Sequence, residues 1–69
     1  MEKGTGTIFS IKTGGNAGVI KEDGSTANLD FINPSIPGVS IGDRFEFLKI
    51  IQSTPNGEKV INVLQVKLP

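Results

Sequence analysis

The sequence predicts a small all-β protein, and three observations support this fold class. Glycine, proline and asparagine recur at short intervals, and 9 of the 69 residues are glycine and 4 are proline. These intervals leave no room for a long helix. The segments between them are rich in β-branched and aromatic residues. The segments expected to be strands are residues 7–11, 17–21, 27–31, 44–51 and 60–66.

The first two expected strands are separated by a glycine-rich turn. Residues 7–11 are β-branched and aromatic, and they end at a Thr-Gly-Gly-Asn cluster that is suited to positive backbone angles. Residues 17–21 end near the Asp-Gly dipeptide at 23–24, which is typical of a hairpin. The stretch at residues 14–18 could also cradle a phosphate. A hairpin turn is the preferred interpretation, because no Lys-Ser or Lys-Thr pair follows it.

The third expected strand alternates strictly between apolar and polar residues. Its two faces are Ala27, Leu29 and Phe31 on one side, and Asn28 and Asp30 on the other. The apolar face is expected to look inward and the polar face to meet water. Residues 32–38 contain two prolines and can hold at most a single helical turn, so they are expected to be a connector.

The last two segments form the second expected hairpin. Residues 44–51 alternate at first and then become apolar on both sides, which predicts a strand buried on both faces as it bends around a barrel. The turn at residues 53–57 contains proline and Asn-Gly, which end any strand. Residues 60–66 then return as the fifth strand.

Five short strands favour a barrel, because they cannot form two full sheets and because closure removes exposed edges. We therefore expect residues 1–69 to form a single domain, a five-stranded antiparallel barrel of the oligonucleotide/oligosaccharide-binding (OB) fold. An SH3-like barrel is the alternative on strand count alone. The turn-rich connector between the third and fourth strands favours the OB fold.

The composition argues against several classes of function. The chain has no cysteine and no histidine, so it offers no thiolate metal site and no activated nucleophile. Asp23, Asn28 and Asp30 lack the spacing of a calcium loop. We expect no enzymatic activity, no metal and no cofactor.

Net charge and hydropathy limit the partners and the location that we expect for this chain. Seven basic residues balance seven acidic ones, so any attraction for a polyanion must be local. The first residues lack the apolar stretch of a signal peptide or membrane span. We therefore expect a cytoplasmic protein with no membrane contact.

Five segments carry a further pattern. Residues 4–10 read G-T-G-T-I-F-S, residues 15–20 read G-N-A-G-V-I, and residues 27–31 read A-N-L-D-F. Residues 42–47 read G-D-R-F-E-F, and residues 57–63 read G-E-K-V-I-N-V. In this order and spacing they resemble the cold-shock domain motifs G-x-V-K-W-F-N, K-G-F-G-F-I, V-F-V-H-F, G-x-x-V-x-F and G-x-x-A-x-N-V. The resemblance covers nearly the whole chain and implies binding of single-stranded DNA or RNA, with bases stacked on surface aromatics.

The chain departs from this family at most of the aromatic positions, and its first turn is longer. The replacements are Ile8 for tryptophan, Ala17, Val19 and Asn28 for phenylalanine, and Asp30 for histidine. Phe9 and Phe31 remain as rings. Each stacked base contributes about 1–3 kcal/mol, so the loss of most of these rings implies that binding is weak. The anion at position 30 repels phosphate.

Six residues are expected to form the nucleic-acid-binding face: Ile8, Phe9, Lys12, Val19, Asn28 and Phe31. Lys3 and Lys21 could extend a small basic strip beside them, although ordinary solvated lysines are the alternative. Core packing is the alternative for Phe31, which shares its strand face with Leu29. A second hypothesis is a protein-interaction surface, in which an aliphatic patch of Ile8, Ala17 and Val19 receives apolar side chains of a protein partner.

Overall fold

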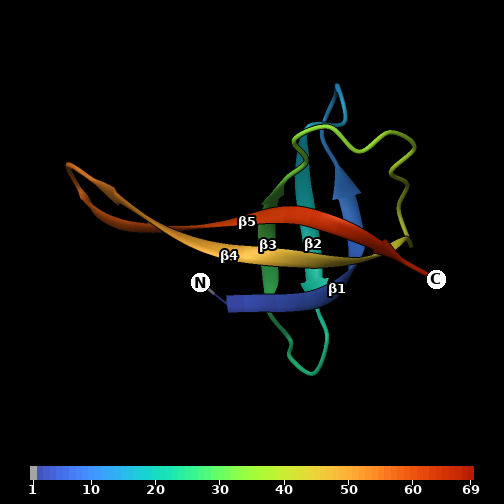
Figure 1. The fold of residues 1–69 in the computed structure, drawn as a ribbon, viewed down its shortest axis with the longest axis horizontal. Helices are drawn as coiled ribbons and strands as arrows, with labels where there is room; N and C mark the ends of the chain where they lie inside the picture. The colour runs from blue at the N-terminus through green and yellow to red at the C-terminus, as the bar shows by residue number, and fades with distance from the viewer. Residues whose placement is uncertain (1) are drawn as a thin grey trace.

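The computed structural model describes residues 2–69, which form a closed five-stranded barrel (Figure 1). All five expected strands are confirmed, and most are longer than predicted. Their bounds are β1 (Glu2–Ile11), β2 (Ala17–Glu22), β3 (Asn28–Ile32), β4 (Arg44–Thr54) and β5 (Gly57–Leu68). The order around the barrel is β1-β2-β3-β5-β4, which is consistent with an OB-like barrel.

The sheet is mixed, so the expectation of a purely antiparallel barrel is wrong. Four neighbouring pairs are antiparallel, whereas β3 and β5 run parallel through the pairs Phe31↔Asn62 and Ile32↔Val63. The reason is geometric. Strand directions cannot alternate all the way around a ring with an odd number of strands, so a closed ring of five must contain a parallel pair.

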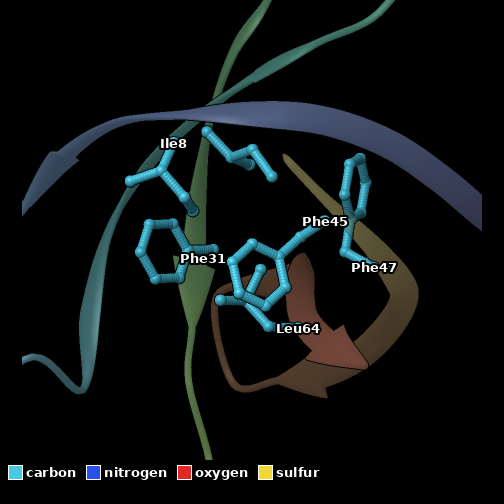
Figure 2. Packing of buried hydrophobic residues seen from close by; sticks show 6 residues of the cluster. Ile8, Phe31, Phe45, Phe47 and Leu64 are labelled. Carbon is cyan, nitrogen blue, oxygen red and sulfur yellow. The ribbon is translucent and has the colours of Figure 1, made fainter. Parts of the chain in front are cut away.

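The core consists of side chains that every strand directs into the barrel (Figure 2). Its fully buried members are Ile8, Ile20, Phe31, Phe45, Phe47 and Leu64. Alternation accounts for most of this set, because inward residues on a strand are two positions apart. Phe31 therefore lies in the core, as its shared parity with the half-buried Leu29 indicated.

A bulge in β1 decides which of its side chains enter the core. Ile8 pairs with the buried Ile20, and the register then shifts so that Ser10 faces Val19 and Ile11 faces Gly18. The extra residue on the bulged strand is Phe9. A bulge of this kind interrupts the alternation, so Ile8 and Ile11 both contribute to the core while Phe9 points outward.

Beyond the barrel, β4 and β5 continue as a two-stranded arm, which we define as residues 50–61. Figure 1 shows this hairpin extending well past the other strands. Among the described residues, pairing of β4 with β1 ends at Lys49, so the arm strands pair only with each other. Ile51 is 64% exposed, and the predicted burial of residues 44–51 on both faces is therefore wrong. No layer of the barrel lies over this part of β4.

The connector of residues 33–43 is fastened to the β1–β2 turn at Asn33, through its buried side-chain amide and through its backbone N–H, which donates to the Asn16 carbonyl oxygen at 2.8 Å. The Asn33 Nδ2 atom donates to the carbonyl oxygens of Ile36 at 2.9 Å and Gly15 at 3.3 Å, and its Oδ1 accepts from the Ile36 N–H at 2.9 Å. The connector and the β1–β2 turn therefore cover the same end of the barrel.

Residues 2–69 contain no helix that is long and apolar enough to cross a membrane.

Candidate nucleic-acid interface

The outward side of β1, β2 and β3 forms one continuous surface, which we call the outer face. Cross-strand pairs place Val19 beside Asp30, Lys21 beside Asn28, and Ser10 beside Val19. The residues of the outer face are Phe9, Ser10, Ala17, Val19, Lys21, Asn28, Asp30 and Ile32. The face therefore combines one aromatic ring, small or apolar residues, and polar groups of both charges.

Phe9 is the aromatic group of this face. Its side chain is 52% exposed, whereas the rings of Phe31, Phe45 and Phe47 are buried. The Lys21 Nζ atom lies 4.9 Å from the centroid of the Phe9 ring, a cation–π distance. A ring held at the surface beside an ammonium group offers a stacking platform with a cation next to it.

A groove runs between the outer face and the arm. It has a volume of about 220 Å³ and is lined on the sheet side by Ala17, Asp30 and Ile32. Lys12 and Lys59 contribute from the end of β1 and from β5. The arm therefore converts one edge of an open sheet surface into a concave site with an amine from each side.

Ion pairing divides the basic residues of the chain into two groups. Four of them lie within 4.0 Å of a carboxylate, in the pairs Lys3–Glu46, Arg44–Asp23, Lys49–Glu22 and Lys67–Asp43. The three that form no ion pair within residues 2–69 are Lys12, Lys21 and Lys59. All three belong to the outer face or its groove. A chain with no net charge thus has a local excess of free amines at this surface.

The paired cations lie elsewhere and serve the barrel. The Lys49 Nζ atom is 2.7 Å from Glu22 Oε2, and this hydrogen bond raises the pKa of Lys49 above its ordinary value of 10.5. Arg44 contacts Asp23, whose Oδ2 also accepts from Thr5 Oγ1 at 2.9 Å. These groups connect β1, β2 and β4, so they are not free to bind a ligand.

Four of the six predicted site residues lie where a ligand could reach them. Phe9, Val19 and Asn28 belong to the outer face, and Lys12 lines the groove. Ile8 and Phe31 are each 1% exposed and belong to the core, so neither side chain offers a ring or an apolar surface on which a base could stack, although Phe31 lies beneath the groove. Ile8 faces inward because it pairs with the buried Ile20, and Phe31 because it follows the parity of its strand.

Lys59 was not predicted as part of the site. It follows the Asn56-Gly57 turn by two residues, a position that the sequence alone assigns to an exposed hairpin end. The parallel pairing of β3 with β5, which begins at Phe31 and Asn62, brings it to the groove beside Asp30. No local sequence signal identifies a contact of this kind.

The glycine-rich turn and the acidic residues are the remaining places at which a phosphate or metal site could be expected. The glycine-rich residues 14–16 form a turn in which the Gly15 N–H donates to the Lys12 carbonyl oxygen at 2.9 Å. Within residues 2–69, no group of three or more acidic, histidine or cysteine residues is placed to hold a metal ion.

No protein-family model matches the chain, and neither curated proteins nor solved structures give a significant match.

Proposed function

We propose that this chain is a divergent cold-shock-like OB-fold domain that binds single-stranded DNA or RNA weakly, in the cytoplasm, through its outer face and groove. The observation that carries the proposal is that the three lysines without a carboxylate partner lie on this one surface, with Lys21 over the exposed Phe9 ring and Lys12 and Lys59 in the groove. Single-strand binding combines a basic groove that follows the phosphates with aromatic rings that stack bases. Both parts are present here in reduced number.

The order of the strands supports the same proposal. In OB folds, ligands bind to the face of strands 2 and 3 and to the loops that follow strands 1 and 4. The outer face and groove occupy the corresponding surface of this barrel. One ring and three amines provide for one stacked base and about three phosphates, so we expect sequence-tolerant binding of modest strength.

Titration of a fluorescein-labelled oligonucleotide, followed by anisotropy, tests the proposal. With three phosphate contacts, the salt dependence of a single strand has a slope of about −2, which lowers the affinity about 20-fold between 50 and 200 mM salt. Removing the ring in Phe9→Ala removes one stacking platform and lowers the affinity about 5- to 150-fold. Binding that ignores both salt and this substitution would refute the proposal.

Matched variants separate this site from general electrostatics. Lys12→Gln with Lys59→Gln removes two free amines and lowers the salt slope by about 1.4. Lys3→Gln with Lys67→Gln removes the same charge from lysines that already contact Glu46 and Asp43. We expect the second pair of changes to leave the slope nearly intact.

Protein recognition is a second candidate function, favoured by the apolar surface of the arm. The aliphatic patch expected at Ile8, Ala17 and Val19 is reduced, because Ile8 is buried. The arm instead exposes the cross-strand pair Ile51 and Val60, which lie at 64% and 55% exposure. Docking on such a surface depends little on salt, so the same titration series, carried out with a protein partner in place of the oligonucleotide, distinguishes the two functions.

A further inference from the structure

The Asp30 side chain is an unpartnered carboxylate at the centre of the candidate interface. Within residues 2–69 its carboxylate forms no hydrogen bond and no ion pair. The backbone at this point is well held, because the Asn62 Nδ2 atom donates to the Asp30 carbonyl oxygen at 2.9 Å. Val19 lies beside it on β2. The strand thus holds the backbone at this position, and the exposed carboxylate is free to accept hydrogen bonds from a ligand.

The surroundings of Asp30 determine which part of a nucleic acid can meet it. Asp30 lines the groove together with Lys12 and Lys59, while Ala17 and Ile32 supply its apolar surface. A phosphate is repelled by the carboxylate and attracted by the two amines. A strand that places its phosphates at the lysines and away from Asp30 leaves the carboxylate open to the polar edge of a base.

The hydrogen-bonding pattern of the bases then discriminates among them. A carboxylate only accepts hydrogen bonds, and it binds best where two donors face its two oxygens. Guanine presents its N1–H and N2 amino donors side by side on the Watson–Crick edge, which proteins read in single strands. Adenine and cytosine present one amino donor beside an acceptor nitrogen. Thymine and uracil present one imino donor between two carbonyl oxygens, which the carboxylate repels.

We propose that Asp30 makes this interface selective for guanine, with thymine and uracil bound most weakly at the same position. This inference rests on the proposed function, since it assigns a base preference to the same site. A good bidentate pair discriminates a base about 5- to 150-fold. The expected preference for one guanine over one thymine lies in that range.

The test uses a thymidine oligomer of about nine nucleotides, within the site size of one OB fold, with a single guanine placed at each position in turn. We expect one or two placements to bind at least about 5-fold more tightly than the all-thymidine strand. Inosine at the same placement lacks the N2 amino group and should lose most of the gain. The variant Asp30→Asn should abolish the preference while binding the all-thymidine strand as well as, or better than, the natural protein.

A matched control and three outcomes complete the test. Glu58→Gln removes an equivalent unpaired acid from the arm and should leave the guanine preference unchanged. Salt-sensitive binding with no preference in the natural protein would overturn the role of Asp30 and leave the proposed function standing. A preference that persists in Asp30→Asn would also overturn that role. Failure of every oligomer to bind would instead overturn the proposed function itself.

Discussion

The substitution Gly18→Ala should be among the most damaging single-methyl changes in this barrel. Gly18 lies in β2, between Ile11 of β1 and Phe31 of β3. A Cβ atom at this position would overlap the carbonyl oxygen of Ser10 and lie 2.8 Å from Phe31 Cε1. Its φ is not positive, so the effect is steric and not conformational.

The expected magnitude follows from what must move. The Phe31 ring would have to retreat by about 0.6 Å to reach ordinary contact at 3.4 Å, but it is fully buried. The Ser10 carbonyl belongs to the bulged backbone of β1 and cannot rotate away as a side chain can. Overpacking usually destabilises by about 1–3 kcal/mol, and backbone obstruction places this case at or above about 3 kcal/mol. A domain of this length has about 3–10 kcal/mol of stability in total.

Urea denaturation followed by far-ultraviolet circular dichroism is the suitable assay, because the chain has no tryptophan and no tyrosine. Gly4→Ala is the comparison variant, since the three nearest atoms to its new Cβ belong to side chains, Phe47 Cζ at 2.6 Å and Glu22 Oε2 at 3.2 Å among them, and no backbone atom is as close. Because the Phe47 ring is also buried, we expect it to lose about 1–3 kcal/mol, the ordinary cost of overpacking, and less than Gly18→Ala. A Gly18→Ala protein within about 1 kcal/mol of the natural one would refute the close approach of β2 to the β1 bulge.

Two further predictions concern the polar groups that hold the barrel. Asn33→Ala removes the amide that ties the connector to the first turn, so we expect a loss of about 1–3 kcal/mol in urea denaturation and faster amide exchange at Ile36; an unchanged urea midpoint would contradict this role. The second prediction concerns alkaline pH. Glu22 raises the pKa of Lys49 in the folded state, so the stability from this pair is fully present below pH 10.5 and is lost as the pH rises through the folded pKa. Urea midpoints measured across this range should fall more steeply for the natural protein than for Glu22→Gln, and equal slopes would argue against the pair.

Strand positions could be predicted from the sequence because turn residues and alternation are local signals. Phe31 shows how far alternation reaches, since its parity with Leu29 predicted burial and the structure confirms it. The same rule fails at Ile8 and Phe9, where two apolar residues are adjacent and either could face inward. The pairing of Ile8 with Ile20 decides between them, and that pairing depends on a strand further along the chain.

The arm marks a second limit of local patterns. Two adjacent isoleucines at 50 and 51 predicted a strand covered on both sides, but apolar residues indicate only a tendency toward burial. Whether anything covers Ile51 depends on where the neighbouring strands end. The pairing of β1 with β4 ends at Lys49 among the described residues, and Ile51 lies beyond it.

The candidate interface illustrates why net charge is a poor guide to binding in a chain this small. The count of seven basic and seven acidic residues predicts no attraction for a polyanion. Folding changes this expectation, because four ion pairs occupy acids and bases together and leave Lys12, Lys21 and Lys59 free on one surface. The potential near a groove depends mostly on nearby charges, because charges more than a Debye length of about 8–10 Å away are largely screened. Asp30 is the one carboxylate of the outer face, and because it lines the groove together with Lys12 and Lys59, the role we propose for it is to choose a base and not to exclude the strand.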